Sequence, residues 1–523
     1  MKSMKSIPVI LLLLSLAVQF AQSDKILVVS FFSSKSHKIT YMRLIEALAE
    51  KGHQITVVTP VKSNKEVKNI REIFTLDLET MMEDKFNPFE MKKTGQKMNP
   101  FLMLDEFGDI CRKTYDLPQI KGLLKEDFDL IFMQPLFNDC VLGLVHRLKA
   151  PLVLFMPIGA PNFLVSKIGG HLPPSFVSNV FLGYSDEMTF YQRMMNFGTN
   201  IFMDSIMKFY YEPYMSSLYR EKLGQDIPTA SEVLGNASLI LSNGHFSLAR
   251  PRPYLPDVID VGGIHSHPAK PLPKDLEDFV SQGKDGFIYF SMGSAIKGMQ
   301  MPEERRQLFI RVFSKLKQQV LWKYETETMP DLPKNIKLSK WFPQQDVLGH
   351  KNARIFITHC GGGGTEEAIY HGVPLIGFPM FGDQDMNARL AKNQGFLYQL
   401  DWNTVTEEQL TTAIHEVLNN KQYRESVQKI SKVFKDQPND PLTRGVYWVE
   451  YVLRHKGAPQ LRSASRKLNF IQYHSLDVIA AYLSIIFGAL YIIFATLRWI
   501  VRKVCGGSSK DKKSLNLNKK KNQ

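Results

Sequence analysis

The chain has 523 residues, of which 44% are hydrophobic, and its 65 Lys and Arg exceed its 51 Asp and Glu to give a net charge of +14. This length and apolar content predict two or three domains with separate cores. Much of the positive charge lies in residues 498–523, which hold nine basic residues and one acid, so the charge does not indicate a nucleic-acid partner.

The first 23 residues have the pattern of a cleavable signal peptide. Lys2 and Lys5 precede an apolar run at residues 7–18, and the small residues Ala21 and Ser23 follow. The run is too short to span a bilayer, so residues 1–23 are predicted to direct the chain into the secretory pathway and to be removed.

Residues 24–250 are predicted to form a Rossmann-like domain. An apolar strand at 25–30, an amphipathic helix at 40–51 and a second strand at 54–60 make a βαβ opening. Further apolar strands are expected at residues 128–133, 150–157 and 237–242.

Six prolines in residues 251–273 mark a linker, set at 251–274. The alternation of strands and helices restarts at Phe287, which predicts a second Rossmann-like domain over 275–477. The expected fold class is therefore α/β, with two halves that face each other across a cleft. Ligands bind such sheets beyond the carboxyl ends of the strands.

The most specific motif spans residues 341–384. A buried strand at 354–358 leads into Gly361, Gly362, Gly363 and Gly364, and a short helix follows at 365–370. Backbone N–H groups and the positive end of a helix make this turn an anion site, suited to a diphosphate. The glycine spacing does not match GxGxxG or a Walker loop, which excludes a nicotinamide-dependent oxidoreductase.

This motif resembles the signature of the UDP-glycosyltransferases, membrane-anchored enzymes with the GT-B fold. The resemblance implies that Trp341 stacks on uracil, that Gln344 reaches the uridine and that Glu367 holds the ribose hydroxyls. It also implies that His359, the glycine turn and Thr365 meet the diphosphate, and that Asp383 and Gln384 bind the sugar. Ser294, in the segment 287–294, is a further phosphate contact or an ordinary turn serine. Gly363 and Gly364 stand where relatives often carry polar residues.

His37 follows the first strand, where relatives carry their general base. It would accept the proton of an acceptor hydroxyl, which attacks the anomeric carbon opposite UDP and inverts it. Gln134 occupies the place of the supporting acid, and an amide does not stabilise an imidazolium as a carboxylate does. Asp139 is the substitute candidate for this acid; a turn or helix-capping role is the alternative.

Residues 176–215 are crowded with Phe, Tyr and Met. They form either packed helices or an adaptable apolar wall for a lipophilic acceptor. In the second case, part of this wall would enter the membrane face.

Residues 478–497 carry no charge and lack the polar face of a core helix, so a transmembrane helix is predicted. The basic tail at 498–523 is then cytoplasmic, and Lys520 and Lys521 match a dilysine retrieval signal unless they form only a solvated cluster. These features predict a single-pass type I protein of the endoplasmic reticulum with a lumenal body.

The cysteines and the remaining sites are sparse. The predicted lumenal body contains Cys111, Cys140 and Cys360, with Cys505 on the other side of the membrane, and this odd and sparse set argues against a disulfide framework. No Cys or His pairs have zinc spacing, so no metal is expected. Asn236 begins the N-glycosylation motif Asn-Ala-Ser.

Together these patterns predict an inverting UDP-hexosyltransferase that acts on the hydroxyl of a small lipophilic acceptor. The UDP-sugar is a co-substrate, and no cofactor is expected. Glucose is favoured, with glucuronate left open because Arg252 stands where it could meet a sugar carboxylate. Self-association or association with related transferases follows from the resemblance. The alternative is a catalytically weak UDP-sugar-binding membrane protein that modulates partner transferases.

Overall fold

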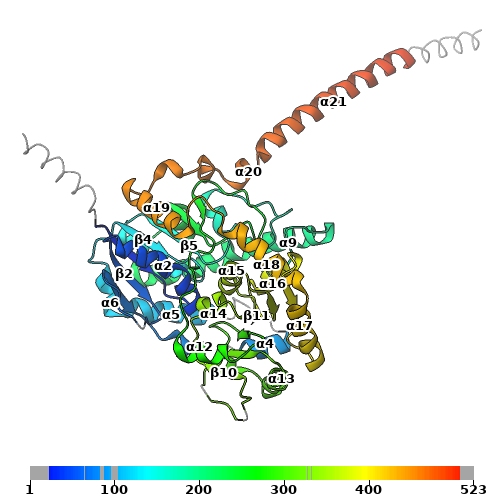
Figure 1. The fold of residues 1–523 in the computed structure, drawn as a ribbon. Helices are drawn as coiled ribbons and strands as arrows, with labels where there is room; N and C mark the ends of the chain where they lie inside the picture. Colours follow the sequence, from blue (N-terminus) through cyan, green and yellow to red (C-terminus); the bar gives the residue numbers. More distant parts are fainter. Residues whose placement is uncertain are drawn as a thin grey trace, which may run out of the picture. The chain divides into compact units, whose positions relative to one another are not determined.

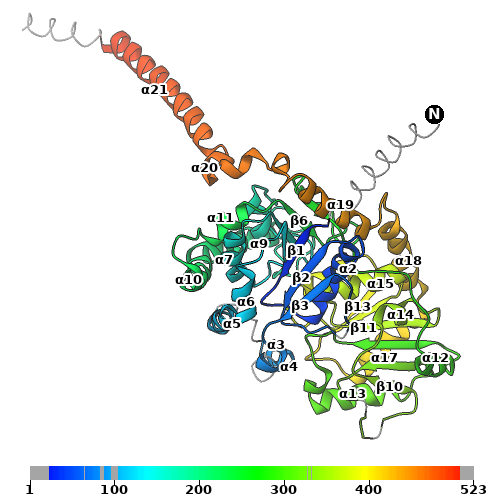
Figure 2. The same ribbon diagram turned by 90° about the vertical axis from the view of Figure 1, so that its left-hand side faces the viewer.

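The computed structural model describes residues 23–63, 65–82, 87–95, 104–326, 328–330 and 332–506. The predicted signal peptide, except Ser23, lies outside these residues, as do Lys520 and Lys521. The chain divides into two compact units with the boundary between Ser463 and Ala464. The first unit contains two parallel sheets with their helices, and the second contains one long helix (Figures 1 and 2).

The first sheet is built from short apolar strands that are buried on both faces. In β1 (Lys25–Val29), Leu27 and Val29 belong to one core and Ile26 and Val28 to another. This alternation follows the period of a strand, and burial on both faces is typical of a parallel sheet between helical layers. All seven strands are parallel, in the order β3-β2-β1-β4-β5-β6-β7. The other strands are β2 (Gln54–Thr59), β3 (Ile70–Phe74), β4 (Leu130–Met133), β5 (Leu152–Met156), β6 (Leu239–Ser242) and β7 (Val258–Asp260).

The second sheet repeats this design with six parallel strands in the order β10-β9-β8-β11-β12-β13. In β8 (Phe287–Ser291), Ile288 and Phe290 enter one core while Phe287 and Tyr289 enter the opposite one. The remaining strands are β9 (Gln319–Lys323), β10 (Ile336–Ser339), β11 (Ala353–Thr358), β12 (Leu375–Gly377) and β13 (Leu397–Gln399). The predicted α/β class with two parallel sheets is confirmed.

Helices cover both sheets (Figures 1 and 2). Those before the second sheet are α2 (Lys35–Glu50), α3 (Leu78–Met82), α4 (Pro88–Thr94), α5 (Leu104–Asp116), α6 (Pro118–Leu123), α7 (Leu142–Leu148), α8 (Asn162–Val165), α9 (Phe190–Ile206), α10 (Glu212–Leu223), α11 (Ala230–Gly235) and α12 (Lys274–Ser281). Those that follow in the first unit are α13 (Glu303–Phe313), α14 (Gln344–Gly349), α15 (Gly362–His371), α16 (Gln384–Asn393), α17 (Glu407–Asn419), α18 (Lys421–Lys435) and α19 (Pro441–Arg454).

Two elements differ from the sequence-based expectation. Helix α2 begins at Lys35 rather than residue 40, because the Ser34 hydroxyl caps it by accepting from the His37 N–H at 3.3 Å. His37 therefore lies in the first helical turn and not on the preceding loop. The proline-rich stretch 251–274 contains β7, whose Val258 pairs with Ile240 of β6. The last strand of the first sheet thus lies inside the predicted linker.

The end of the first unit returns to the first sheet. Helix α19 places Val446, Val449 and Val452 in the core that contains Ile26 and Val28 of β1. It lies beside α2 (Figure 2), where Glu450 pairs with Lys51 at 2.6 Å. The final helix of this unit therefore packs against the first sheet, although it follows the second sheet in the chain.

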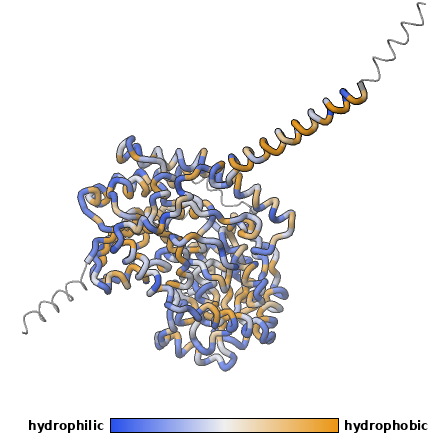
Figure 3. Tube along the Cα trace, turned by 90° about the horizontal axis from the view of Figure 1, so that it is seen from above, coloured by the Kyte–Doolittle hydropathy of each residue, from blue (hydrophilic) through white to orange (hydrophobic). Residues whose placement is uncertain are grey.

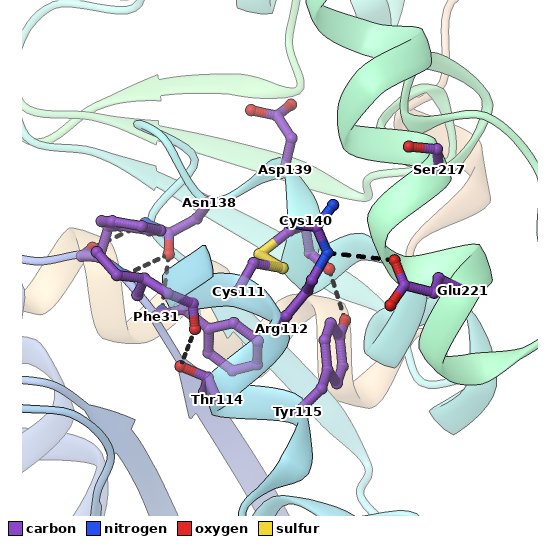
Figure 4. The surroundings of a disulfide bond; sticks show 12 residues. Phe31, Cys111, Arg112, Thr114, Tyr115, Asn138, Asp139, Cys140, Ser217 and Glu221 are labelled. Atoms are coloured by element: carbon purple, nitrogen blue, oxygen red, sulfur yellow. Dashed lines mark hydrogen bonds and ion pairs between the residues drawn. A yellow bond between two sulfur atoms is a disulfide. The ribbon is translucent and has the colours of Figure 1, made fainter. Parts of the chain in front are cut away.

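The expectation of no disulfide framework is wrong, because Cys111 of α5 and Cys140 are bonded to each other (Figure 4). Their spacing of 29 residues gave no signal, since the pairing depends on α5 packing beside the loop after β4. The disulfide is buried in the core that contains Leu27 and Val29 of β1. In this core the Tyr115 hydroxyl donates to the Cys140 carbonyl at 2.5 Å. Cys360 is a buried free thiol and Cys505 an exposed one.

Helix α9 does not pack as a core helix, whereas the π-helix Met207–Tyr211 that follows it contributes Tyr211 to the core. The only buried residue of α9 is Asn196, whereas Phe190 and Phe209 are 74% and 75% exposed. Other side chains of the same segment, Met203 and Met207, line an internal cavity. The aromatic stretch is therefore divided between solvent and cavity, so neither expected role describes it alone.

The second unit contains α20 (Phe470–Tyr473) and α21 (Leu476–Gly506). Within the described part of the chain, Leu476–Cys505 is the one helix long and apolar enough to cross a membrane, and none of it is buried in protein. Its hydrophobic colour along most of its length is evident in Figure 3. This helix includes the predicted span 478–497.

Removal of the disulfide is expected to destabilise the first unit. The double variant Cys111→Ala/Cys140→Ala should lose about 3 kcal/mol of unfolding free energy, because the bond closes a loop and restricts the unfolded chain. Denaturant unfolding in detergent measures this difference. A reductant should shift the wild-type midpoint and leave the variant unchanged; equal midpoints for the two proteins under oxidising conditions would contradict the expectation.

Candidate active site

The glycine turn leads directly from β11 into α15. The strand ends at Thr358, and Gly361 is the residue that caps the helix, in extended conformation and without a side chain. The helix begins at Gly362, three residues before the predicted start. Its first N–H groups have no partner within the helix, so they are available to an anion at its positive end.

The imidazole of His359 is held between two glycines. A Cβ on Gly293 or on Gly361 would lie 2.5 Å from the ring, so neither position accepts a larger residue without displacing it. Gly293 also has φ +81°, which favours glycine. Burial, aided by the charge of Lys323, lowers the pKa of His359 to about 4. The ring is therefore neutral at pH 7 and can offer an N–H to a phosphate oxygen.

Three residues predicted to bind the nucleoside come from neighbouring elements. Gln344 at the start of α14 donates to the Glu367 carboxylate and accepts from the Tyr289 hydroxyl at 3.1 Å. Burial raises the pKa of Glu367 to about 7, although the hydrogen bond from Gln344 opposes the shift. Trp341 is 50% exposed, which leaves its ring surface open to a planar base.

Asp383 and Gln384 lie at the start of α16, and internal contacts engage both of them. The Asp383 carboxylate accepts from Asn387 Nδ2 at 2.6 Å, and burial raises its pKa. The Gln384 Oε1 accepts from the Met380 and Phe381 backbone N–H groups at 2.9 and 3.2 Å.

The residue before His37 contacts the donor side through one backbone hydrogen bond. The N–H of its neighbour Ser36 donates to the Ser294 hydroxyl at 3.3 Å, a bond between the first helix of one sheet and the loop after β8 of the other. Thr365, by contrast, turns inward and bonds the Gly361 carbonyl at 3.0 Å. The structure therefore brings Ser294 into contact with the residue that precedes His37.

The His37 ring contacts Gln134 and not Asp139. Gln134 Nε2 lies 3.2 Å from His37 Nδ1. Burial lowers the pKa of His37 to about 4. Asp139 instead accepts from the Tyr211 hydroxyl at 2.9 Å, and burial raises its pKa to about 6. Its carboxylate points away from Asn138 and from the disulfide (Figure 4).

A mostly apolar cavity of about 200 Å³ lies beside Asp139 and Tyr211. Its wall includes Asp139, Met203, Met207 and Tyr211, and it reaches Gly362 at the start of α15. Arg252 also lies in the wall. A cavity of this composition fits a small lipophilic molecule near the anion-binding helix end.

Glu366 was missed by the motif analysis and joins the two sheets. Its Oε2 accepts from Asn243 Nδ2 at 2.8 Å and from the Gly263 N–H at 3.3 Å, so a residue of α15 holds the loops after β6 and β7. His265 also spans this junction and meets the Gly363 carbonyl at 3.2 Å. Burial raises the pKa of Glu366 to about 8. The doubled acid in an otherwise apolar helix was the available signal.

Two further predictions are the N-glycosylation motif at Asn236 and the absence of a metal. The Asn236 side chain is exposed, but Ser238 of the same motif is fully buried where β6 begins. Across the described ranges, no three His, Cys, Asp or Glu side chains gather closely enough to hold a metal ion. Use of the motif and independence from metal stay predictions.

Comparisons with known proteins agree with this architecture. A family model described as UDP-glucoronosyl and UDP-glucosyl transferase matches residues 24–511. The chain is a UDP-glycosyltransferase. This assignment makes it a transferase enzyme and confirms the family expected from the motif.

Two relatives of this UDP-glycosyltransferase show the range of the family. It is 33% identical to UDP-glucosyltransferase 2 of Dactylopius coccus, over 88% of each chain. It is 35% identical to human UDP-glucuronosyltransferase 2B7, over 95% of this chain and 96% of the relative. A UDP-glucosyltransferase structure from Polygonum tinctorium superposes with a TM-score of 0.55 at 17% identity, over 83% of this chain and 99% of that one. Such structural neighbours confirm the GT-B fold.

The junction at Glu366 gives the transferase a pH-dependent stability. Because the pKa of Glu366 is raised to about 8, the folded protein keeps this proton at pH values where the unfolded chain has lost it. Stability conferred by the protonated form is therefore lost as pH rises from about 5 to about 8. Between about pH 5 and pH 8.5, wild type should lose about 2 kcal/mol more unfolding free energy than Glu366→Gln, as measured by denaturant unfolding. Equal losses in both proteins would contradict the role assigned to this carboxyl.

Proposed function

We propose that this chain transfers a hexosyl group from a UDP-sugar to the hydroxyl of a small lipophilic acceptor, with inversion at the anomeric carbon. The observation that carries the proposal is the juxtaposition of the two halves: Gly362 of the α15 anion site lines the apolar cavity, and Ser36, the residue before His37, bonds Ser294. Trp341, Gln344 and Glu367 hold the uridine in this proposal. His359 and the glycine turn hold the diphosphate.

The sugar would lie between the two sheets, near Asp383 and Gln384. The acceptor oxygen attacks the anomeric carbon while the bond from that carbon to the UDP oxygen breaks, and the electron pair leaves with UDP. His37 is assigned to orient the acceptor oxygen, and the proton of the acceptor hydroxyl passes to water. Holding the two reactants in line supplies a large part of such an acceleration, because a bimolecular encounter becomes intramolecular.

Glucose is the proposed sugar, with glucuronate as the second candidate. Relatives of both kinds are similarly distant, at 33% and 35% identity, so similarity does not separate them. Arg252 has the charge to meet a glucuronate carboxylate. However, Asp260 also lines the cavity and interacts electrostatically with Arg252. A resident carboxylate lowers the need for a second one, which favours a neutral hexose.

We further propose that the enzyme is a type I protein of the endoplasmic reticulum membrane. The apolar helix α21 supports an anchor. The bond between Cys111 and Cys140 supports a lumenal body, since disulfides persist in oxidising compartments. Detoxification or storage of lipophilic compounds is a role that fits this location. The modulator alternative is not favoured, because the relatives are named as transferases.

The proposal is tested by sugar transfer in microsomes to a panel of phenols and lipophilic alcohols. UDP-glucose and UDP-glucuronate are offered separately to wild type and to His37→Ala. We expect transfer from UDP-glucose, and a loss of about 10²-fold in kcat/KM in the variant, because the acceptor oxygen is no longer oriented. Absence of transfer from either donor, in protein that still binds UDP, would contradict the proposal.

The donor assignment makes a separate prediction for Glu367. At pH 8, above the Glu367 pKa of about 7, Glu367→Gln should raise the KM for the UDP-sugar about tenfold, because hydrogen bonds from ribose hydroxyls to a charged group are stronger than those to an amide. Steady-state kinetics with varied donor measures this change. Glu408→Gln, which alters an exposed acid of α17, is the matched control and should keep the wild-type KM. A change in kcat alone for Glu367→Gln would argue against ribose contact.

A further inference from the structure

The orientation of the buried amide of Asn138 is fixed by backbone groups. Its Oδ1 accepts from the Phe31 and Phe32 N–H groups at 2.7 and 2.8 Å. Its Nδ2 donates to the Phe32 and Leu136 carbonyls at 2.8 and 2.9 Å. Backbone N–H groups only donate and carbonyls only accept, so a reversed amide would oppose four partners at once.

The orientation of Asn138 in turn fixes that of Gln134. The two hydrogens of Asn138 Nδ2 are shared among three acceptors, the third of which is Gln134 Oε1 at 3.1 Å. If the Gln134 amide were reversed, two NH₂ groups would face each other in a buried site, since Gln134 is only 2% exposed. The Gln134 NH₂ is therefore the group that lies 3.2 Å from His37 Nδ1.

The His37 tautomer follows from this chain of hydrogen bonds. A donor at 3.2 Å requires a lone pair on Nδ1, so in the neutral ring the proton is on Nε2. In this tautomer Nε2 donates a hydrogen bond and cannot accept the proton of an acceptor hydroxyl. In a serine protease, an acid-to-amide change produces the same unproductive histidine tautomer and lowers kcat about 10⁴-fold.

Among the described residues, no carboxylate is hydrogen-bonded to the His37 ring. Asp139, the nearest candidate in sequence, is committed to the Tyr211 hydroxyl at 2.9 Å and points away from Asn138 (Figure 4). A proton taken by His37 would therefore have no anionic partner to stabilise it.

We infer that Asn138 and Gln134 hold His37 as an Nε2–H donor, and that the enzyme selects acceptors whose hydroxyl ionises before attack, such as acidic phenols. This inference rests on the proposed function and refines its acceptor class. The acceptor loses its proton to water, and His37 Nε2–H positions the resulting oxyanion. An oxyanion lone pair forms the bond to the anomeric carbon, and the electron pair of the broken bond leaves on the UDP oxygen. Gln134 is a positioning residue, because it acts through His37.

The test compares phenol with increasingly fluorinated phenols, because fluorine lowers the phenol pKa with little change in shape. The full-length enzyme in microsomes is assayed with the UDP-sugar that it uses. For wild type, kcat/KM should rise as the phenol pKa falls. Gln134→Glu, which keeps the length of the side chain and can accept a hydrogen bond from Nδ1–H, should flatten this dependence and raise kcat/KM for unsubstituted phenol about tenfold or more.

Gln134→Met is the matched control, since it removes the donor from Nδ1 without supplying a carboxylate. Because the ring can then carry its proton on either nitrogen but still lacks an anionic partner, the dependence on acidity should be weaker than in wild type and steeper than in Gln134→Glu. UDP binding by each variant reports that the fold is retained. Transfer that is independent of phenol acidity in wild type, or an unchanged slope in Gln134→Glu, would overturn the inference while leaving the proposed function intact. No transfer to any phenol by any of these proteins would overturn both.

Discussion

The geometry of the cleft depends on one buried carboxyl, that of Glu366. Each Rossmann-like half has a core on either side of its own sheet, and apolar contacts of Phe89 and α19 join the two halves. Glu366 adds a directional contact at the cleft by accepting from Asn243 and Gly263, which follow the last two strands of the first sheet. A single buried group with two donors is more directional than an apolar contact, because hydrogen bonds impose both length and angle.

The cleft contains polar groups but little fixed charge. Burial lowers the pKa values of His37, His265 and His359 to about 4, and raises those of Glu366 and Glu367 to about 8 and about 7. Neutral imidazoles offer directed N–H groups, and partly protonated carboxyls repel a diphosphate less than full charges would. Hydrogen-bond direction, rather than net attraction, therefore governs recognition of the nucleotide in this arrangement.

Local patterns in the sequence were sufficient to predict the sheets and the family. The apolar runs at β1 and β11 and the glycine turn before α15 depend on neighbours within a few residues. The disulfide and the junction at Glu366 were not predictable in this way, because each joins segments brought together only by folding. The start of α2 was placed too late for a simpler reason: Ser34 is a good helix cap that the periodicity of apolar residues does not reveal.

Asn138 links three segments that the sequence keeps apart: the loop after β1, the loop after β4 and, through Gln134, the first turn of α2. Glutamine and glutamate codons differ in a single base, so the hydrogen bond at the end of this chain is one point mutation away from its acidic form. The shape of the cleft would be preserved in such a change, since the two side chains have the same length. A gene of this kind could alternate between sets of acceptors during evolution while its fold, its donor site and its cavity stay constant.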